Sequence, residues 1–225
     1  MKNTMLNKLY QYRFELFFFS QIAILFGSLL FPSDFFENIL SPVLFLMNLG
    51  AGILLIAKNK KLMWFFVMLL VFSVIFFGIE VTKKQDTKFL DFLDMGIYFL
   101  FYVVVTFEII KQIWGTKIIN KNVIFGLMSG YISLGLIGFF ICISIEMAYP
   151  GSFEGLNVTI SQPEILTERL MYYSYITLLT IGYGEIVPVS ILAQKAAVLI
   201  GMMGQFYLVI LTAIIVGKYI NQQRE

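Results

Sequence analysis

The chain has 225 residues, of which 59% are hydrophobic and only 13% charged, too few charges to cover a soluble globular domain of this size. The formal net charge is +2 and the basic residues are scattered, so the sequence gives no basic face for nucleic acid. With no histidine and one cysteine, Cys142, it excludes an intrachain disulfide, a His/Cys zinc site and a His-dependent triad.

Six apolar runs follow one another along the chain. They cover residues 14–31, 39–57, 62–79, 92–113, 123–148 and 190–217. A helix needs roughly 17 to 25 apolar residues to cross a hydrocarbon core of about 30 Å, and these runs are near that length. We expect helices because backbone that faces lipid must satisfy its own hydrogen bonds. The first run has no evident cleavage site after it, so it is interpreted as a retained span.

Lysine and arginine divide unevenly between the two sides that six spans create. The side with both termini holds eleven of them: Lys2, Lys8, Arg13, Lys58, Lys60, Lys61, Lys111, Lys117, Lys121, Lys218 and Arg224. The other side holds five: Lys83, Lys84, Lys88, Arg169 and Lys195. Because cytoplasmic loops carry the excess of basic residues, we predict a multi-pass cell-membrane protein with both termini in the cytoplasm.

The fourth run contains no lysine or arginine between residues 92 and 110. A voltage sensor needs several basic residues in the membrane, because one charge crossing 100 mV supplies only about 2.3 kcal/mol. We therefore expect weak or absent voltage gating, and a local ion pair between Glu108 and Lys111. Asp94, Glu108 and Glu146 lie near the ends of apolar runs, where they are either solvated, which we prefer, or in contact between the first four helices and the last two.

Runs five and six differ from the others in what they contain and how they are joined. Run five includes Gly126-Leu127-Met128-Ser129-Gly130, a small-residue spacing that predicts close helix packing inside the C-terminal region. The connection to run six, residues 149–189, is far longer than the other connections. Within it, residues 166–179 form an aromatic run that is too short to span a bilayer. We expect them to enter the membrane as a half-helix and return as extended backbone, which requires cover by protein or a water-filled cavity.

The residues after this half-helix form the most distinctive motif of the chain. They read Thr177-Leu178-Leu179-Thr180-Ile181-Gly182-Tyr183-Gly184-Glu185-Ile186-Val187-Pro188. They resemble the filter of tetrameric potassium channels, in which rings of backbone carbonyls directed at one axis replace the water around K⁺. Successive carbonyls on one side need conformations that Gly182 and Gly184 adopt without a Cβ penalty. The side chains of Ile181 and Tyr183 would pack outward, and the Thr180 hydroxyl would add an oxygen at the inner mouth.

The segment resembles the signature of the tetrameric potassium-channel family, whose filter reads Thr-Val-Gly-Tyr-Gly-Asp with a proline shortly after. The resemblance covers about 95 residues, from run five to run six. It implies a homotetramer in which each chain supplies a quarter of every oxygen ring. K⁺ would be the permeant ligand at Thr180, Ile181, Gly182 and Tyr183, within a filter that ends at Gly184, and no cofactor is expected. The alternative is an exposed turn without ion chemistry.

Three positions depart from the commonest family pattern. Leu179 stands where many members have a second threonine, Glu185 where aspartate is usual, and Ile176 where some members have a carboxylate behind the filter. The resemblance assigns support of the filter to Tyr172, Tyr173, Thr177, Glu185 and Pro188. We expect Glu185 to accept a hydrogen bond from Tyr172 and so to hold the outer mouth.

Run six contains Gly201 and Gly204, although an interior glycine costs about 1 kcal/mol relative to alanine in a helix. Gly204 matches the family's hinge glycine, where the inner helix would bend to open the pore. Close packing of either glycine against the half-helix is an equally weighted alternative. One face of this helix is expected to line a water-filled vestibule: Gln205, Leu208, Thr212 and Val216.

The sequence therefore predicts an all-α membrane protein of six transmembrane helices, with a re-entrant pore helix and an extended filter between helices five and six. Residues 1–120 would form a four-helix domain without voltage-sensor charges, and residues 121–225 the pore domain. A potassium channel subunit is the first hypothesis for function. A poorly selective cation channel is the second, since Leu179 could loosen the filter, and a transporter or auxiliary subunit the third. No cluster of titratable residues suggests an enzyme, and a lipid or an unidentified partner is left open as the gating stimulus.

Overall fold

The structure is a computed structural model that describes residues 9–32, 35–82, 88–116, 118–157 and 163–222. These residues are mostly helical and separate into two compact units, residues 1–130 and 131–225. Among the described residues, three helical stretches are long and apolar enough to cross a membrane: Met95–Gly115, Lys121–Ala148 and Ile191–Gln222. The expectation of a mostly helical membrane protein is thus confirmed, while the count of six spans stays a prediction.

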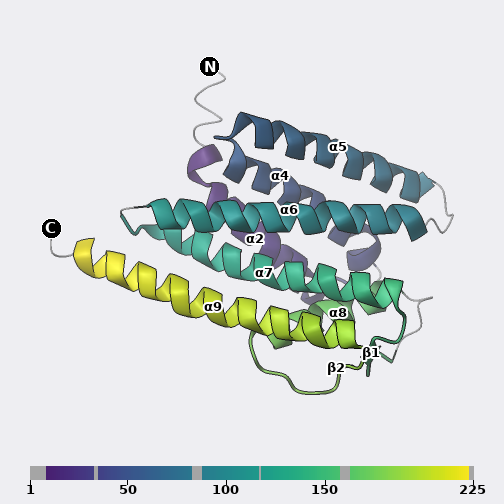
Figure 1. The fold of residues 1–225 in the computed structure, drawn as a ribbon. Helices are drawn as coiled ribbons and strands as arrows, with labels where there is room; N and C mark the ends of the chain where they lie inside the picture. The colour runs from purple at the N-terminus through teal and green to yellow at the C-terminus, as the bar shows by residue number, and fades with distance from the viewer. Residues whose placement is uncertain (1–8, 33–34, 83–87, 117, 158–162, 223–225) are drawn as a thin grey trace. The chain divides into compact units, whose positions relative to one another are not determined.

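The helices of the first unit follow the predicted apolar runs (Figure 1). They are α2 (Arg13–Phe26), α4 (Ser41–Ile56), α5 (Lys60–Thr82) and α6 (Lys88–Gly115), with a 3₁₀ turn (Gly27–Leu29) after α2 and a π-helical turn (Phe36–Leu40) before α4. Polar residues set their ends. Asn59 lies before α5, and its Oδ1 accepts the amide of Leu62 at 3.4 Å. Such side-chain acceptors satisfy amides that a helix start leaves unpaired.

A buried asparagine joins three helices of the first unit. Asn48 on α4 is fully buried, and its Nδ2 donates to Ser20 Oγ on α2 at 2.7 Å. The Tyr102 hydroxyl on α6 donates to Asn48 Oδ1 at 2.7 Å. Polar side chains inside a membrane bundle are expensive unless they bond across helices. This network therefore fixes the register of α2, α4 and α6 against one another.

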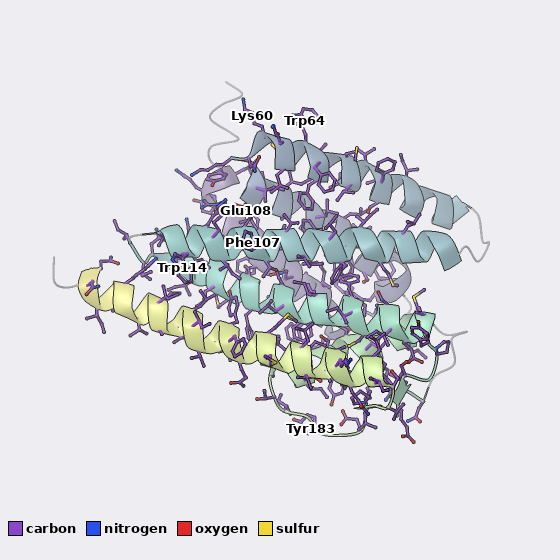
Figure 2. The ribbon with its side chains drawn as sticks, in the orientation of Figure 1. Lys60, Trp64, Phe107, Glu108, Trp114 and Tyr183 are labelled. Atoms are coloured by element: carbon purple, nitrogen blue, oxygen red, sulfur yellow. The ribbon has the colours of Figure 1, made fainter. Side chains whose placement is uncertain are left out.

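The ends of the first unit carry charged and aromatic side chains. Lys111 Nζ lies 3.6 Å from Glu108 Oε1, which confirms the predicted ion pair. Trp64 and Trp114 are 67% and 59% exposed and lie toward the end of the unit where Lys60 is found (Figure 2). Exposed tryptophans with nearby lysines are typical of a membrane–water interface. The side chain of Asp94 lies outside the described residues.

The small-residue face at the start of α7 (Lys121–Ala148) packs differently from our prediction. Gly126 contacts α2: a Cβ built at this glycine would lie 3.0 Å from the ring of Phe14. Ser129 Oγ, also on this face, lies 3.5 Å from the carbonyl oxygen of Phe14. The prediction that this face packs inside the C-terminal region was therefore wrong, because α2 occupies it.

The second unit contains the rest of α7, the strand β1 (Phe153–Glu154), α8 (Pro163–Leu178), the strand β2 (Val187–Pro188) and α9 (Ile191–Gln222) (Figure 1). The two strands pair antiparallel, with Phe153 opposite Pro188 and Glu154 opposite Val187. α8 coincides with the predicted half-helix, and its 16 residues are too few to span a bilayer.

Two glycines of α7 let α8 approach closely. A Cβ at Gly135 would collide with the ring of Tyr175, and one at Gly138 would lie 2.5 Å from Ser174 Oγ. Because the two glycines have no side chains, the residues of α8 reach the backbone of α7. Ser174 Oγ donates to the Gly135 carbonyl at 2.7 Å, and the Tyr175 hydroxyl donates to the Ile132 carbonyl at 2.7 Å. Small residues that bring backbones within hydrogen-bonding range are how membrane helices associate. α8 is therefore held firmly by α7 within this unit.

Candidate functional site

The backbone between α8 and β2 alternates in conformation at every second residue. Thr180 has φ +57°, Gly182 +57° and Gly184 +93°, whereas φ is not positive at Ile181 and Tyr183. In an ordinary strand successive carbonyls point to opposite sides, and reversing every second residue turns them toward one side. Glycine adopts positive φ freely, but an L-residue such as Thr180 is strained there by about 1–2 kcal/mol. Such strain persists only where the surroundings fix it.

The backbone amides of this segment donate hydrogen bonds to carbonyls at the end of α8. The amide of Thr180 donates to the Thr177 carbonyl at 3.0 Å, and the amides of Ile181 and Gly182 donate to the Ile176 carbonyl at 2.9 and 3.3 Å. Within the described part of the chain, the carbonyl oxygens of residues 180–184 accept no hydrogen bond. Backbone carbonyls need a partner such as water or a cation. The segment therefore directs its amides to the end of α8 and leaves its oxygens available.

The side chains of the segment are exposed in the single chain. Ile181 is 48% exposed and Tyr183 74%, and Figure 2 shows Tyr183 on the long connection that leads away from α8. Leu179, just before the segment, is 46% exposed. The side chains of Ile181 and Tyr183 were predicted to pack outward against surrounding helices, but the described residues of one chain do not cover them.

At the outer end of the segment, the structure brings together the two residues expected to form a hydrogen bond. The side chains of Tyr172 and Glu185 are hydrogen-bonded, which lowers the pKa of Glu185 and raises the pKa of Tyr172 to about 12. The charge of Arg169 also lowers the pKa of Glu185, by a smaller amount. The contact links Glu185, the residue that follows the segment, to the middle of α8.

This contact predicts acid sensitivity. The pKa of Glu185 lies below its ordinary value of 4.5, so the contact stabilises the folded outer mouth above about pH 4.5 and is lost as pH falls through the lowered value. If the segment is the K⁺ filter that the resemblance implies, K⁺ flux through the wild-type protein in liposomes is expected to fall as the pH drops below 4.5, and Tyr172→Phe is expected to show much of this loss already at pH 7. A Tyr172→Phe protein with wild-type flux, K⁺/Na⁺ preference and acid response would contradict this role.

The inner end of the segment rests on α9. A Cβ at Gly204 would collide with the carbonyl oxygen of Leu178, whereas one at Gly201 would make an ordinary contact, 4.0 Å from the Thr177 carbonyl oxygen. The Tyr131 hydroxyl also reaches the Leu178 carbonyl, at 3.4 Å. α9 is a continuous helix at Gly204. Close packing, one of the two alternatives for this glycine, is therefore present in the structure, and bending at Gly204 stays a prediction.

The remaining candidate residues lie in two places. Tyr173 is buried, its hydroxyl bonds with Thr177, and its ring centroid lies 5.1 Å from that of Phe153. Pro188 lies in β2 opposite Phe153. The predicted vestibule face of α9 is separate from the stripe that α9 buries at Ala193, Ala196, Ile200, Gly204, Tyr207 and Leu211. Its residues are all exposed in the single chain: Gln205, Leu208, Thr212 and Val216.

Sequence reasoning missed the role of Glu146. We preferred a solvated carboxylate, but Glu146 is only 5% exposed and accepts the backbone amides of Gly151 and Phe153. The preference was wrong because the chain turns back immediately after α7 and covers this side chain. A carboxylate in the last turn of an apolar helix, followed by Pro150-Gly151, is the signal that could have found it.

Comparison with known families matches the same region. Residues 159–221 match a family model described as ion channel, little more than a quarter of the chain. No curated protein and no solved structure matches the chain. The matched residues include α8, the alternating segment, β2 and nearly all of α9. Over residues 159–221 the chain is therefore similar to pore-loop ion channels.

Proposed function

We propose that the chain is one subunit of a potassium-selective channel in which four copies surround a common axis. The carbonyl oxygens of Thr180, Ile181, Gly182 and Tyr183 coordinate K⁺ in place of water, and K⁺ crosses the membrane passively. The observation that carries this proposal is the alternating backbone at Thr180, Gly182 and Gly184, together with carbonyls that accept no hydrogen bond from the described residues. Rings of such oxygens are what a K⁺ filter requires.

The end of α8 supports a cation site electrostatically. α8 ends at Leu178, two residues before Thr180. A helix carries a partial negative charge at its C-terminus, about half an elementary charge, because its last carbonyls are unpaired. Two of these carbonyls, those of Ile176 and Thr177, accept the amides of the filter segment. α8 therefore both orients the segment and favours positive charge near its inner end.

Exposed apolar surface supports assembly of several copies. One chain offers one oxygen to each ring, so a complete ring needs other subunits around the axis. Ile181 and Tyr183 are exposed in the single chain, as are Val198, Phe206 and Val209 on α9, at 63%, 56% and 65%. In the proposed homotetramer, neighbouring subunits cover the filter side chains, and lipid or neighbouring helices cover α9. The face with Gln205 and Thr212 then borders the vestibule.

The rest of the chain forms the lipid-embedded surroundings of this pore. We infer six spans, namely α2, α4, α5, α6, α7 and α9, with α8 entering the membrane and returning through the filter. Both termini are then cytoplasmic, in the cell membrane. Between Lys88, the first residue of α6, and Lys111 near its end, α6 has no basic residue, so opening of the purified tetramer is expected to depend weakly on voltage or not at all.

Potassium flux into liposomes tests the proposal. Purified wild-type protein is expected to carry K⁺ into liposomes well above the protein-free background. Tyr183→Ala is expected to reduce this flux to background, because the ring no longer holds the filter between subunits. Tyr12→Ala is the matched control, since Tyr12 is 56% exposed and lies on the first unit. Absence of flux in the wild type, or equal flux in wild type and Tyr183→Ala, would overturn the proposal.

A further inference from the structure

Glu146 in the last turn of α7 is a buried carboxylate with two backbone partners. Its Oε1 accepts the amide of Gly151 at 2.7 Å and its Oε2 accepts the amide of Phe153 at 3.2 Å. Only 5% of the residue is exposed. Burying a carboxylate is costly unless hydrogen bonds replace its water, and bonds to a charged acceptor are the stronger kind. Both oxygens of Glu146 therefore hold the chain as it leaves α7.

The residues that Glu146 holds are paired with the chain that leaves the filter. β1 pairs with β2, and the amide of Val189 donates to the Ser152 carbonyl at 2.9 Å. Ser152 and Phe153 are both buried, at 2% and 3% exposure. We call Glu146, residues 151–155 and residues 187–190 the clasp. It joins the end of α7 to the segment between the filter and α9.

The clasp also touches the filter end directly. Gly155 has φ +87°, and a Cβ there would collide with the backbone carbonyl oxygen of Glu185. Glu185 directly follows Gly184, the last residue of the alternating segment. Gly155 thus lets the backbone before α8 lie against the backbone that follows the filter. The inner end of the filter is fixed by α8, and the outer end by Gly155 and by the bond between Tyr172 and Glu185.

We propose that Glu146 is a positioning residue for the outer end of the filter, acting through the clasp and not by contact with K⁺. The inference rests on the proposed function. The positive φ at Thr180, Gly182 and Gly184 needs external support. Without the carboxylate, the amides of Gly151 and Phe153 lose their acceptors, the β1–β2 pairing loosens, and Glu185 is free to shift. The ordered filter becomes a smaller fraction of the population.

Glu146→Gln tests the proposal because glutamine keeps the size of the side chain but can satisfy only one of the two amides. Amide hydrogen exchange at Val189 in detergent-solubilised protein is expected to rise about tenfold, the effect of losing one hydrogen bond to a charged acceptor. The K⁺ concentration for half-maximal flux in liposomes is expected to rise by a similar factor, about tenfold, because K⁺ binds only the ordered filter. High K⁺ then restores flux, which a misfolded protein would not show.

A matched control separates position from charge. Glu168→Gln removes the same charge on α8, where Glu168 is exposed and makes no hydrogen bond or ion pair with the described residues. It is expected to leave Val189 exchange and the K⁺ dependence of flux unchanged. If Glu168→Gln alters them as much as Glu146→Gln does, the effect comes from surface charge and the proposal is overturned.

A second pair of variants keeps the proposal testable if Glu146→Gln fails to fold. Gly155→Ala and Gly151→Ala both place an alanine at positive φ, +87° and +83°, but only the Cβ at 155 meets Glu185. The two share the backbone strain of an L-residue at positive φ. Gly155→Ala is expected to raise the half-maximal K⁺ concentration well beyond any change in Gly151→Ala. Because Gly151 is also a clasp residue, equal effects of the two variants would show that the contact of Gly155 with Glu185 does not hold the outer end of the filter, which overturns the route proposed from the clasp to the filter.

The outcomes distinguish this inference from the proposed function. Faster Val189 exchange in Glu146→Gln with unchanged K⁺ dependence overturns the positioning role and leaves the channel intact. Unchanged exchange overturns the clasp itself. If the wild type carries no K⁺, the proposed function fails and the inference fails with it. Faster exchange with a raised, K⁺-reversible half-maximal concentration supports it.

Discussion

Gly182→Ala is expected to abolish K⁺ flux in liposomes. Gly182 has φ +57° with open space around it in the single chain, so the substitution causes no clash within the chain and acts there through the backbone. An L-residue in this conformation costs about 1–2 kcal/mol, or about 4–8 kcal/mol over the four copies of the proposed tetramer. Relaxing that strain turns the peptide and moves one carbonyl oxygen of each subunit out of its ring. A ring without its oxygens no longer replaces the hydration shell of K⁺.

Gly217→Ala is the control for this prediction. Gly217 is also a glycine with open space around it, but it lies within α9 and has no positive φ. Alanine is favoured over glycine in a helix by about 1 kcal/mol, so this variant is expected to fold and to conduct normally. Normal K⁺ flux through a folded Gly182→Ala protein would show that the left-handed backbone at this position is not needed for conduction.

The second large effect is expected from Gly204→Ala, which should destabilise the pore region and remove K⁺ flux. A Cβ at this position collides with the carbonyl oxygen of Leu178, a backbone atom that cannot move without shifting the end of α8. Overpacking of this kind costs about 1–3 kcal/mol or more. Because the carbonyls of Ile176 and Thr177 hold the filter amides, a shift of α8 carries the filter with it.

Gly201→Ala, one turn earlier on the same helix, is expected to raise the stability of the protein, whereas Gly204→Ala lowers it. Its Cβ would lie 4.0 Å from the Thr177 carbonyl oxygen, an ordinary contact. The helix gains up to about 1 kcal/mol from the change. Thermal stability in detergent and K⁺ flux in liposomes, measured on both variants, check the pair. If Gly204→Ala is as stable and active as Gly201→Ala, tight packing at Gly204 does not support the filter.

Much of the fold and of the candidate site could be predicted from the sequence. Apolar runs of spanning length predicted the main helices, because lipid-facing backbone has few alternatives to helix. The alternation of Gly182 and Gly184 with other residues predicted the conformations seen there, since positive φ selects glycine. The hydrogen bond between Tyr172 and Glu185 followed from the family resemblance, although its role at the outer mouth stays a prediction.

Features that depend on long-range packing could not be predicted. β1 and β2 have two residues each and lie far apart in the chain, so neither leaves a recognisable period. The spacing of Gly126 and Gly130 indicated close packing but not the partner, which proved to be Phe14 of α2. Glu146 looked like an interfacial acid because the amides that donate to it, those of Gly151 and Phe153, follow it in an irregular turn. These packing partners depend on which surfaces of the fold meet. A small residue or a single carboxylate in the sequence does not specify which surface it will contact.

The reversal potential of the purified protein in a planar bilayer, with K⁺ on one side and Na⁺ on the other, tests the central claim most directly. Carbonyl rings at residues 180–183 predict currents that reverse close to the K⁺ equilibrium potential, and a shift toward zero in Tyr183→Ala. Wild-type currents that reverse near zero would mean a cation pore without K⁺ preference, and the absence of single-channel currents would mean that these oxygens do not form a pore.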